Sequence, residues 1–114
     1  SIGYLTALMI LTLDGNRIAT LPNTIGGMTA LTTLHLYNNQ LAGLPDSIGQ
    51  LTGLETLYLH NNQLTALPES IVALTNLTVL DLDNNPQRIR SAQSAAVQAR
   101  LQALEDGSTS YLSM

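Results

Sequence analysis

The chain has 114 residues, of which 45% are apolar and only 11% are charged, and its net charge is -4. This length predicts one small domain, and the apolar share is too high for a disordered chain. Without cysteine, a disulfide scaffold and a thiolate metal site are excluded. The only basic residues are four arginines, so we expect no nucleic-acid binding, and no apolar run is long enough to predict a membrane span.

A 23-residue repeat dominates the sequence. The string LxxLxL recurs with its first leucine at Leu8, Leu31, Leu54 and Leu77, so we place repeat units over residues 8–87. The two central units read LTTLHLYNNQLAGLPDSIGQLTG and LETLYLHNNQLTALPESIVALTN. A fixed period of this length predicts a solenoid in which each unit packs against its neighbours.

The chain begins with part of such a unit. SIGYLTAL at the start matches SIGQLTGL at 47–54, so we expect residues 1–7 to be the tail of a preceding repeat. A solenoid end needs a polar cap, and none precedes Leu8. We therefore expect a fragment of a longer repeat protein, with an apolar edge that would allow end-to-end self-association.

Each unit has two halves with different periods. LxxLxLxxN alternates apolar and polar residues, as in a half-buried strand, with unit positions 1, 4 and 6 pointing inward. LPxxIxxL has apolar residues three apart, which favours a short helical or 3₁₀ turn beginning at the proline. Stacking then predicts a parallel sheet with one strand per repeat. The predicted core includes Leu11, Leu13 and Ile18 of the first unit as well as the apolar residues of the central units.

Asparagine occupies unit position 9 in every unit, as Asn16, Asn39, Asn62 and Asn85. A polar side chain at an otherwise inward position must be hydrogen-bonded. We predict a ladder that bonds the backbone of adjacent turns, with a structural role.

The repeat pattern ends after Pro86. Residues 88–107 are rich in helix formers, and Val97, Leu101 and Leu104 recur at spacings of three and four. We predict an amphipathic helix that caps the last repeat, with a partner-docking helix as the alternative. Residues 108–114 are expected to form a flexible tail.

These units resemble those of the leucine-rich repeat family, in the subclass with LPxxIxxLxx after the asparagine. The resemblance covers about residues 1–87. It implies an α/β solenoid, a right-handed superhelix with a parallel sheet on its concave face and short helical or 3₁₀ turns on its convex face. Members with such units resemble intracellular scaffolds and include ROCO-type and bacterial proteins. In these proteins the repeats bind other proteins, and any catalysis lies in another domain. The resemblance therefore implies a non-enzymatic, cytoplasmic interaction module.

Aromatic and acidic residues gather at the outward unit positions. Positions 5 and 7 run through His35, Tyr37, Tyr58 and His60 on neighbouring strands, so we expect one contiguous patch. Tyrosine offers a large contact area with a polar tip, and an acidic border favours a basic partner surface. The predicted partner-binding residues are His35, Tyr37, Glu55, Tyr58, His60, Asp81 and Asp83.

Other interpretations of this chain stay open. The patch could be a plain solvated face, or His60 and Asp83 could pair as metal ligands, although three converging ligands are not evident and no cofactor or metal is expected. The whole chain could instead be a structural packing segment of a larger assembly, or a regulatory arm of a multidomain enzyme.

Overall fold

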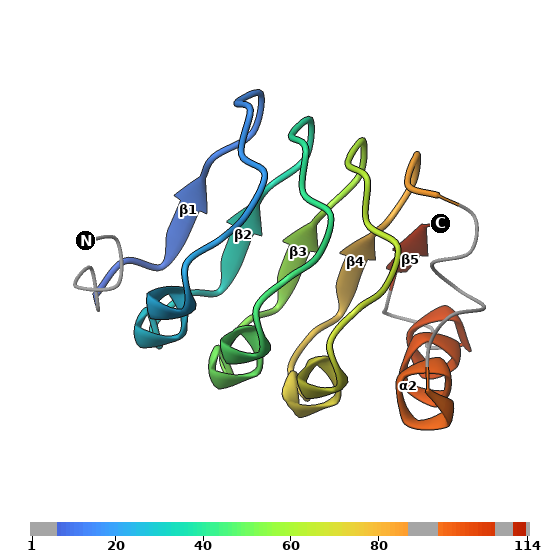
Figure 1. Cartoon of the computed structure of the whole chain (residues 1–114). Coiled ribbons are helices and arrows are strands. Elements are labelled where there is room, and N and C mark those ends of the chain that lie inside the picture. The colour runs from blue at the N-terminus through green and yellow to red at the C-terminus, as the bar shows by residue number, and fades with distance from the viewer. Residues whose placement is uncertain (1–6, 87–93, 107–110, 114) are drawn as a thin grey trace.

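A five-stranded parallel sheet runs the length of the molecule, with its strands side by side in chain order (Figure 1). The computed structural model describes residues 7–86, 94–106 and 111–113. The strands are β1 (Ile10–Thr12), β2 (Thr33–His35), β3 (Thr56–Tyr58), β4 (Val79–Asp81) and β5 (Tyr111–Ser113). The prediction of one strand per repeat unit is confirmed for the units that begin at 8, 31, 54 and 77.

The strand register equals the sequence period. Ile10 pairs with Thr33, Thr33 with Thr56, and Thr56 with Val79, so each step across the sheet is 23 residues. Equivalent unit positions therefore lie in columns across the sheet. The leucines of unit position 4 are buried on the inner side in β2, β3 and β4, while the neighbouring positions 3 and 5 are only half-buried on the other side. We call this outward side, formed by unit positions 3, 5 and 7, the concave face.

Each of the first three units returns through a 3₁₀ helix: η2 (Asn23–Gly27), η3 (Asp46–Gln50) and η4 (Glu69–Ala73). Figure 1 shows them as a parallel row along the solenoid. Pro45 precedes η3 with an extended backbone (φ -69°, ψ 152°), so the turn begins one residue later than predicted. Proline fixes φ but its ψ here is not helical, which makes it the residue before the helix. The buried isoleucine of each turn, such as Ile48, faces the core.

The 3₁₀ turns stack closely because small residues meet between them. A Cβ atom on Gly49 would lie 2.6 Å from the Cβ of Ser70 and 2.7 Å from its carbonyl oxygen. Gly26 stands in the same relation to Ser47. In η4 the equivalent position is Val72, and the neighbour of η4 is a longer helix rather than another 3₁₀ turn. The close spacing of the turns is therefore a property of the glycine-containing units.

The core is one continuous cluster from Leu21 to Leu104. The inward leucines and isoleucines of the two central units are fully or almost fully buried, apart from Leu44. In the first unit the predicted core was too large, because Leu11, Leu13 and Ile18 are only partly buried. Strand β1 has one strand neighbour in the described sheet, so these side chains are covered from one side.

A helix, α2 (Ala95–Asp106), continues the row of turns next to η4 (Figure 1). Val97, Leu101 and Leu104 are buried against the repeats, as the spacing predicted. The backbone N–H of Val97 donates to the Ser94 hydroxyl (3.3 Å), which satisfies one of the free donors of the first turn. Arg100 donates to the carbonyls of Leu74 (3.0 Å) and Leu77 (2.9 Å), a contact that fixes the helix to the last full unit.

The structure describes only part of the segment that follows the repeats. Residues 88–93 of the expected helix lie outside the described residues, and Ser94 precedes the helix. Within the segment 108–114, where we expected a flexible tail, Tyr111–Ser113 pair with β4 in parallel. The open edge of β4 offers unpaired backbone groups, and β5 satisfies them. The expected repeat tail at 1–6 also lies outside the described residues.

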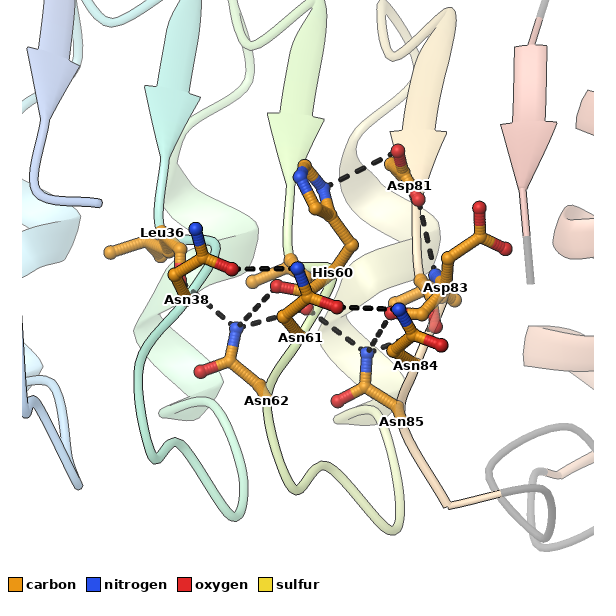
Figure 2. A network of polar contacts seen from close by, with 11 residues as sticks. Leu36, Asn38, His60, Asn61, Asn62, Asp81, Asp83, Asn84 and Asn85 are labelled. Carbon is orange, nitrogen blue, oxygen red and sulfur yellow. Dashed lines mark hydrogen bonds and ion pairs between the residues drawn. The ribbon is translucent and has the colours of Figure 1, made fainter. Parts of the chain in front are cut away.

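The asparagine ladder at unit position 9 has the predicted form (Figure 2). Asn62 donates to the carbonyls of Leu59 and Leu36, both at 2.9 Å, and its Oδ1 accepts from the N–H of Leu41 at 3.1 Å. Asn39 and Asn85 repeat this arrangement one coil away on either side. Each side chain thus bonds its own coil and the preceding one.

A second asparagine ladder was not predicted. Asn38, Asn61 and Asn84, at unit position 8, adopt positive φ angles of 58°, 58° and 59°, where Gly15 has 71° in the first unit. Asparagine tolerates this left-handed conformation better than most residues. The Asn61 amide donates to Asn38 at 2.6 Å, and Asn84 donates to Asn61 at the same distance (Figure 2). These exposed amides link the tight turns that follow the strands.

Candidate functional site

Four rings of the concave face meet on the two central strands. His35 ends β2 and Tyr58 ends β3, and the two residues pair in the sheet register. Tyr37 and His60 follow two residues later, at unit position 7. Inward leucines alternate with them, so strand geometry alone turns all four rings to the same side. We call these four residues the aromatic quartet.

The quartet packs as one cluster. Tyr37 and His60 are stacked, with ring centroids 4.5 Å apart and an interplanar angle of 7°. Tyr58 lies edge-on to both, at 6.2 and 6.0 Å, and is tilted against His35 at 5.0 Å. These distances lie within the range in which aromatic pairs attract. Each ring is therefore held by its neighbours before any ligand arrives.

The quartet lines a hollow of about 290 Å³ that is open to solvent. Its four lining residues are His35, Tyr37, Tyr58 and His60. Pockets for drug-sized molecules generally hold about 300–1,000 Å³. The hollow is thus just below that range, and aromatic rings form its wall.

One acidic group stands on the β4 side of the quartet. Asp81 Oδ2 lies 3.3 Å from His60 Nδ1, an ion-pair distance without hydrogen-bond geometry, and Figure 2 shows the two side chains facing each other. The other oxygen of Asp81 accepts from the backbone N–H of Asp83 at 3.1 Å. The expected neighbour of His60 was Asp83. The structure instead places the Asp81 carboxylate beside the ring, although Asp81 is at unit position 5 and His60 at unit position 7.

A second carboxylate, Asp14, stands on the β1 side. Partial burial raises the pKa of the Tyr37 hydroxyl above its usual value of 10.0, and the hydrogen-bonding, negatively charged Asp14 raises it further. Asp14 was not among the predicted partner-binding residues. The sequence could have indicated it, because Asp14 shares unit position 7 with Tyr37 and His60. The quartet therefore has an acidic side chain on each flank.

Two of the predicted partner-binding residues, Glu55 and Asp83, lie outside the lining of the hollow. Glu55 is exposed. Its backbone carbonyl accepts from the N–H groups of Thr78 and Val79, as a repeat backbone does. Asp83 follows Asp81 at the end of β4.

Within the described part of the chain, no group of three or more histidine, aspartate or glutamate side chains is arranged to hold a metal ion. Three polar atoms of the site are buried without a hydrogen-bond partner among the described residues: Asp14 Oδ1, His35 Nδ1 and His60 Nδ1. None of the helices over the described ranges is long and apolar enough to cross a bilayer. What the site offers is an aromatic surface with acceptor groups.

Successive coils of one strand and one 3₁₀ turn, joined by an inward asparagine ladder, define a repeat solenoid with an open aromatic hollow on its sheet. The leucine rich repeat family matches residues 29–86, half of the chain. The chain belongs to this family, and its fold is a leucine-rich repeat solenoid with a C-terminal helix.

Two solved structures are similar over almost the whole chain. A leucine-rich repeat protein of Leptospira interrogans has a TM-score of 0.81 and 39% identity, over 99% of this chain and 27% of that one. An internalin of Listeria monocytogenes has a TM-score of 0.73 and 26% identity, over 99% and 30%. The chain thus spans less than a third of either protein. No curated protein is detectably similar in sequence.

Proposed function

We propose that this chain is a non-enzymatic module that binds a protein or peptide through the aromatic quartet on its concave face. The observation that carries the proposal is the open aromatic hollow that His35, Tyr37, Tyr58 and His60 form together. Tyrosines gathered at the centre of a surface, with polar residues around them, are typical of protein interfaces.

The family supports the same function. Leucine-rich repeats are typically protein-interaction modules, and members are typically non-enzymatic. The acidic flanks favour a partner with a basic surface. The intracellular setting is also part of the proposal, and it rests on the LPxxIxxLxx form of the units.

Peptide display tests the proposal without a known partner. Peptides are selected on the wild-type chain, and their affinities are then measured by calorimetry for Tyr58→Ala, His60→Ala and Glu69→Gln. Glu69 is an exposed residue of η4, away from the sheet, and serves as the control. Truncating a central aromatic residue should weaken binding by roughly 30-fold, the equivalent of about 2 kcal/mol for a hot spot.

The variants must remain folded for this comparison, which circular dichroism and thermal melting establish. The quartet side chains lie on the surface of the sheet, so their truncation opens no core cavity. Selected peptides that bind Tyr58→Ala and His60→Ala as tightly as the wild type would show that the concave face is not the binding surface.

End-to-end association is a second candidate, favoured by β1. Met9 is 57% exposed and Ile10 58%, the largest exposures of any large apolar residues in the described chain. Unpaired strand edges with apolar side chains promote contacts between molecules. Light scattering after size exclusion at two concentrations tests this, and Ile10→Lys should abolish any concentration-dependent association. A monomer at both concentrations contradicts it.

A further inference from the structure

We propose that the hollow of the aromatic quartet receives an arginine side chain of the partner; this inference rests on the proposed function and specifies it. The hollow has the size for one long side chain rather than for a whole metabolite, since its volume of about 290 Å³ is just below the usual range for drug-sized ligands. The chemistry of the groups that line and flank the hollow then decides which side chain it binds.

The walls favour a cation. The face of a tyrosine ring carries negative potential and attracts a cation within about 6 Å of its centre. Tyr37 and Tyr58 are perpendicular, with ring centroids 6.2 Å apart and an interplanar angle of 87°, and one face of Tyr37 already stacks on His60. The ring surface that stays open lines the hollow, where a planar guanidinium can stack on a ring while its edge stays free to donate.

The flanks carry the complementary charge. Asp14 adjoins Tyr37 on the β1 side, and Asp81 adjoins His60 on the β4 side. The five N–H donors of arginine spread in a plane and can serve acceptors on both sides, whereas the lysine ammonium is a compact point charge. An anionic occupant, such as a phosphorylated or acidic side chain, would meet two carboxylates instead.

Buried acceptors strengthen the negative potential. Asp14 Oδ1 and His35 Nδ1 have no hydrogen-bond partner among the residues that the structure describes, and water does not reach them. Asp14 is half-buried and bonds the Tyr37 hydroxyl, and a carboxylate in such a place is less well screened than a fully exposed one, so it attracts a cation more strongly. The net charge of -4 acts in the same direction at longer range.

The test uses blocked amino acids as probes on the full 114-residue chain. N-acetyl-arginine amide, its neutral isostere N-acetyl-citrulline amide and N-acetyl-lysine amide are titrated while proton NMR follows the histidine ring signals. The chain has two histidines, and both line the hollow, so these signals report on the site directly. We expect saturable shifts with the arginine probe and at least tenfold weaker binding of citrulline and lysine.

Charge variants locate the contact. Asp14→Asn and Asp81→Asn should each weaken binding of the arginine probe by about twofold to fivefold, as expected for partly exposed ion pairs. Glu69→Gln removes the same charge from η4 and should leave the affinity unchanged. Asparagine at 81 keeps an acceptor for the N–H of Asp83, so the end of β4 stays bonded.

The inference is overturned if the arginine probe causes no saturable shift, if citrulline or lysine binds as well, or if Glu69→Gln weakens binding as much as Asp81→Asn. Failure of the arginine probe while selected peptides still require Tyr58 removes this inference and leaves the proposed function standing. Binding of the arginine probe while no selected peptide depends on Tyr58 removes the proposed function and leaves the hollow as a cation site.

Discussion

Replacing Asn62 with alanine should be among the most destabilising single changes in this chain. Its amide donates to the carbonyls of Leu36 and Leu59, and its Oδ1 accepts from the N–H of Leu41. Only 6% of the residue is exposed. The substitution therefore leaves the Leu41 N–H without its acceptor, in a place that water does not easily enter, and it removes one of two donors from each carbonyl, because Asn39 also bonds Leu36 and Asn85 also bonds Leu59.

The expected cost follows from one unpaired donor and two lost hydrogen bonds. A buried donor left without a partner costs about 1–3 kcal/mol, and each hydrogen bond lost from a carbonyl that keeps a second donor costs about 0.5–1.5 kcal/mol. Some relaxation of the loop is expected, so the total should be about 2–4 kcal/mol, a large value for a point substitution. A chain of this size generally has an unfolding free energy of about 6–17 kcal/mol, so the variant would lose a large share of it.

Asn16 provides the matched control. It occupies the same unit position, but it is exposed and donates only to Leu13 and Asp14 of its own coil. Asn16→Ala should cost about 0.5–1.5 kcal/mol, the net value of an ordinary hydrogen bond. Urea titration followed by circular dichroism gives both free energies of unfolding. Equal losses for Asn62→Ala and Asn16→Ala would refute the argument that the bridge between coils is what stabilises the solenoid.

Three further predictions concern packing, the capping helix and ionisation. Gly49→Ala should lower the free energy of unfolding by about 1–3 kcal/mol, because the added Cβ would collide with Ser70. The control is Gly43→Ala, whose added Cβ would have no atom within 4 Å, so urea titration should show little change. Arg100→Met should cost about 1–3 kcal/mol and expose α2 to faster amide hydrogen exchange, because the Leu77 carbonyl after η4 loses the Arg100 donor and the Leu74 carbonyl keeps only the Leu77 N–H. Unchanged exchange would contradict this. The raised pKa of Tyr37 favours the protonated form in the folded state, so its contribution to stability is present below about pH 10 and is lost as pH rises through the raised pKa. Alkaline titration of the ultraviolet absorbance should show a late-titrating component that Tyr37→Phe removes.

The concave patch was predictable as a set of neighbours. Alternation at period two and a 23-residue step place His35 beside Tyr58 and Tyr37 beside His60 without any structure. The orientation of each side chain was not predictable. His60 turns toward Asp81 rather than Asp83, because the rotamer depends on ring stacking with Tyr37 as well as on position. Asp14 entered the site for a similar reason, through its contact with the Tyr37 hydroxyl.

The ends of the repeat array show the limits of pattern reasoning. Val97, Leu101 and Leu104 marked the buried face of α2, but nothing in a polar seven-residue stretch indicated a strand. Tyr111–Ser113 become β5 because β4 presents an open edge next to them.

The repeat itself needed no structure. Its spacing predicted the solenoid, one strand per unit, the inward leucines and the bonded asparagines of unit position 9, since each depends on a local period that sequence records directly. The left-handed asparagine ladder at position 8, the close contact of Gly49 with Ser70, and the aromatic hollow depend on how successive coils lie against each other. Those features are set by distances between residues about one repeat apart in the sequence, which only the packed solenoid determines.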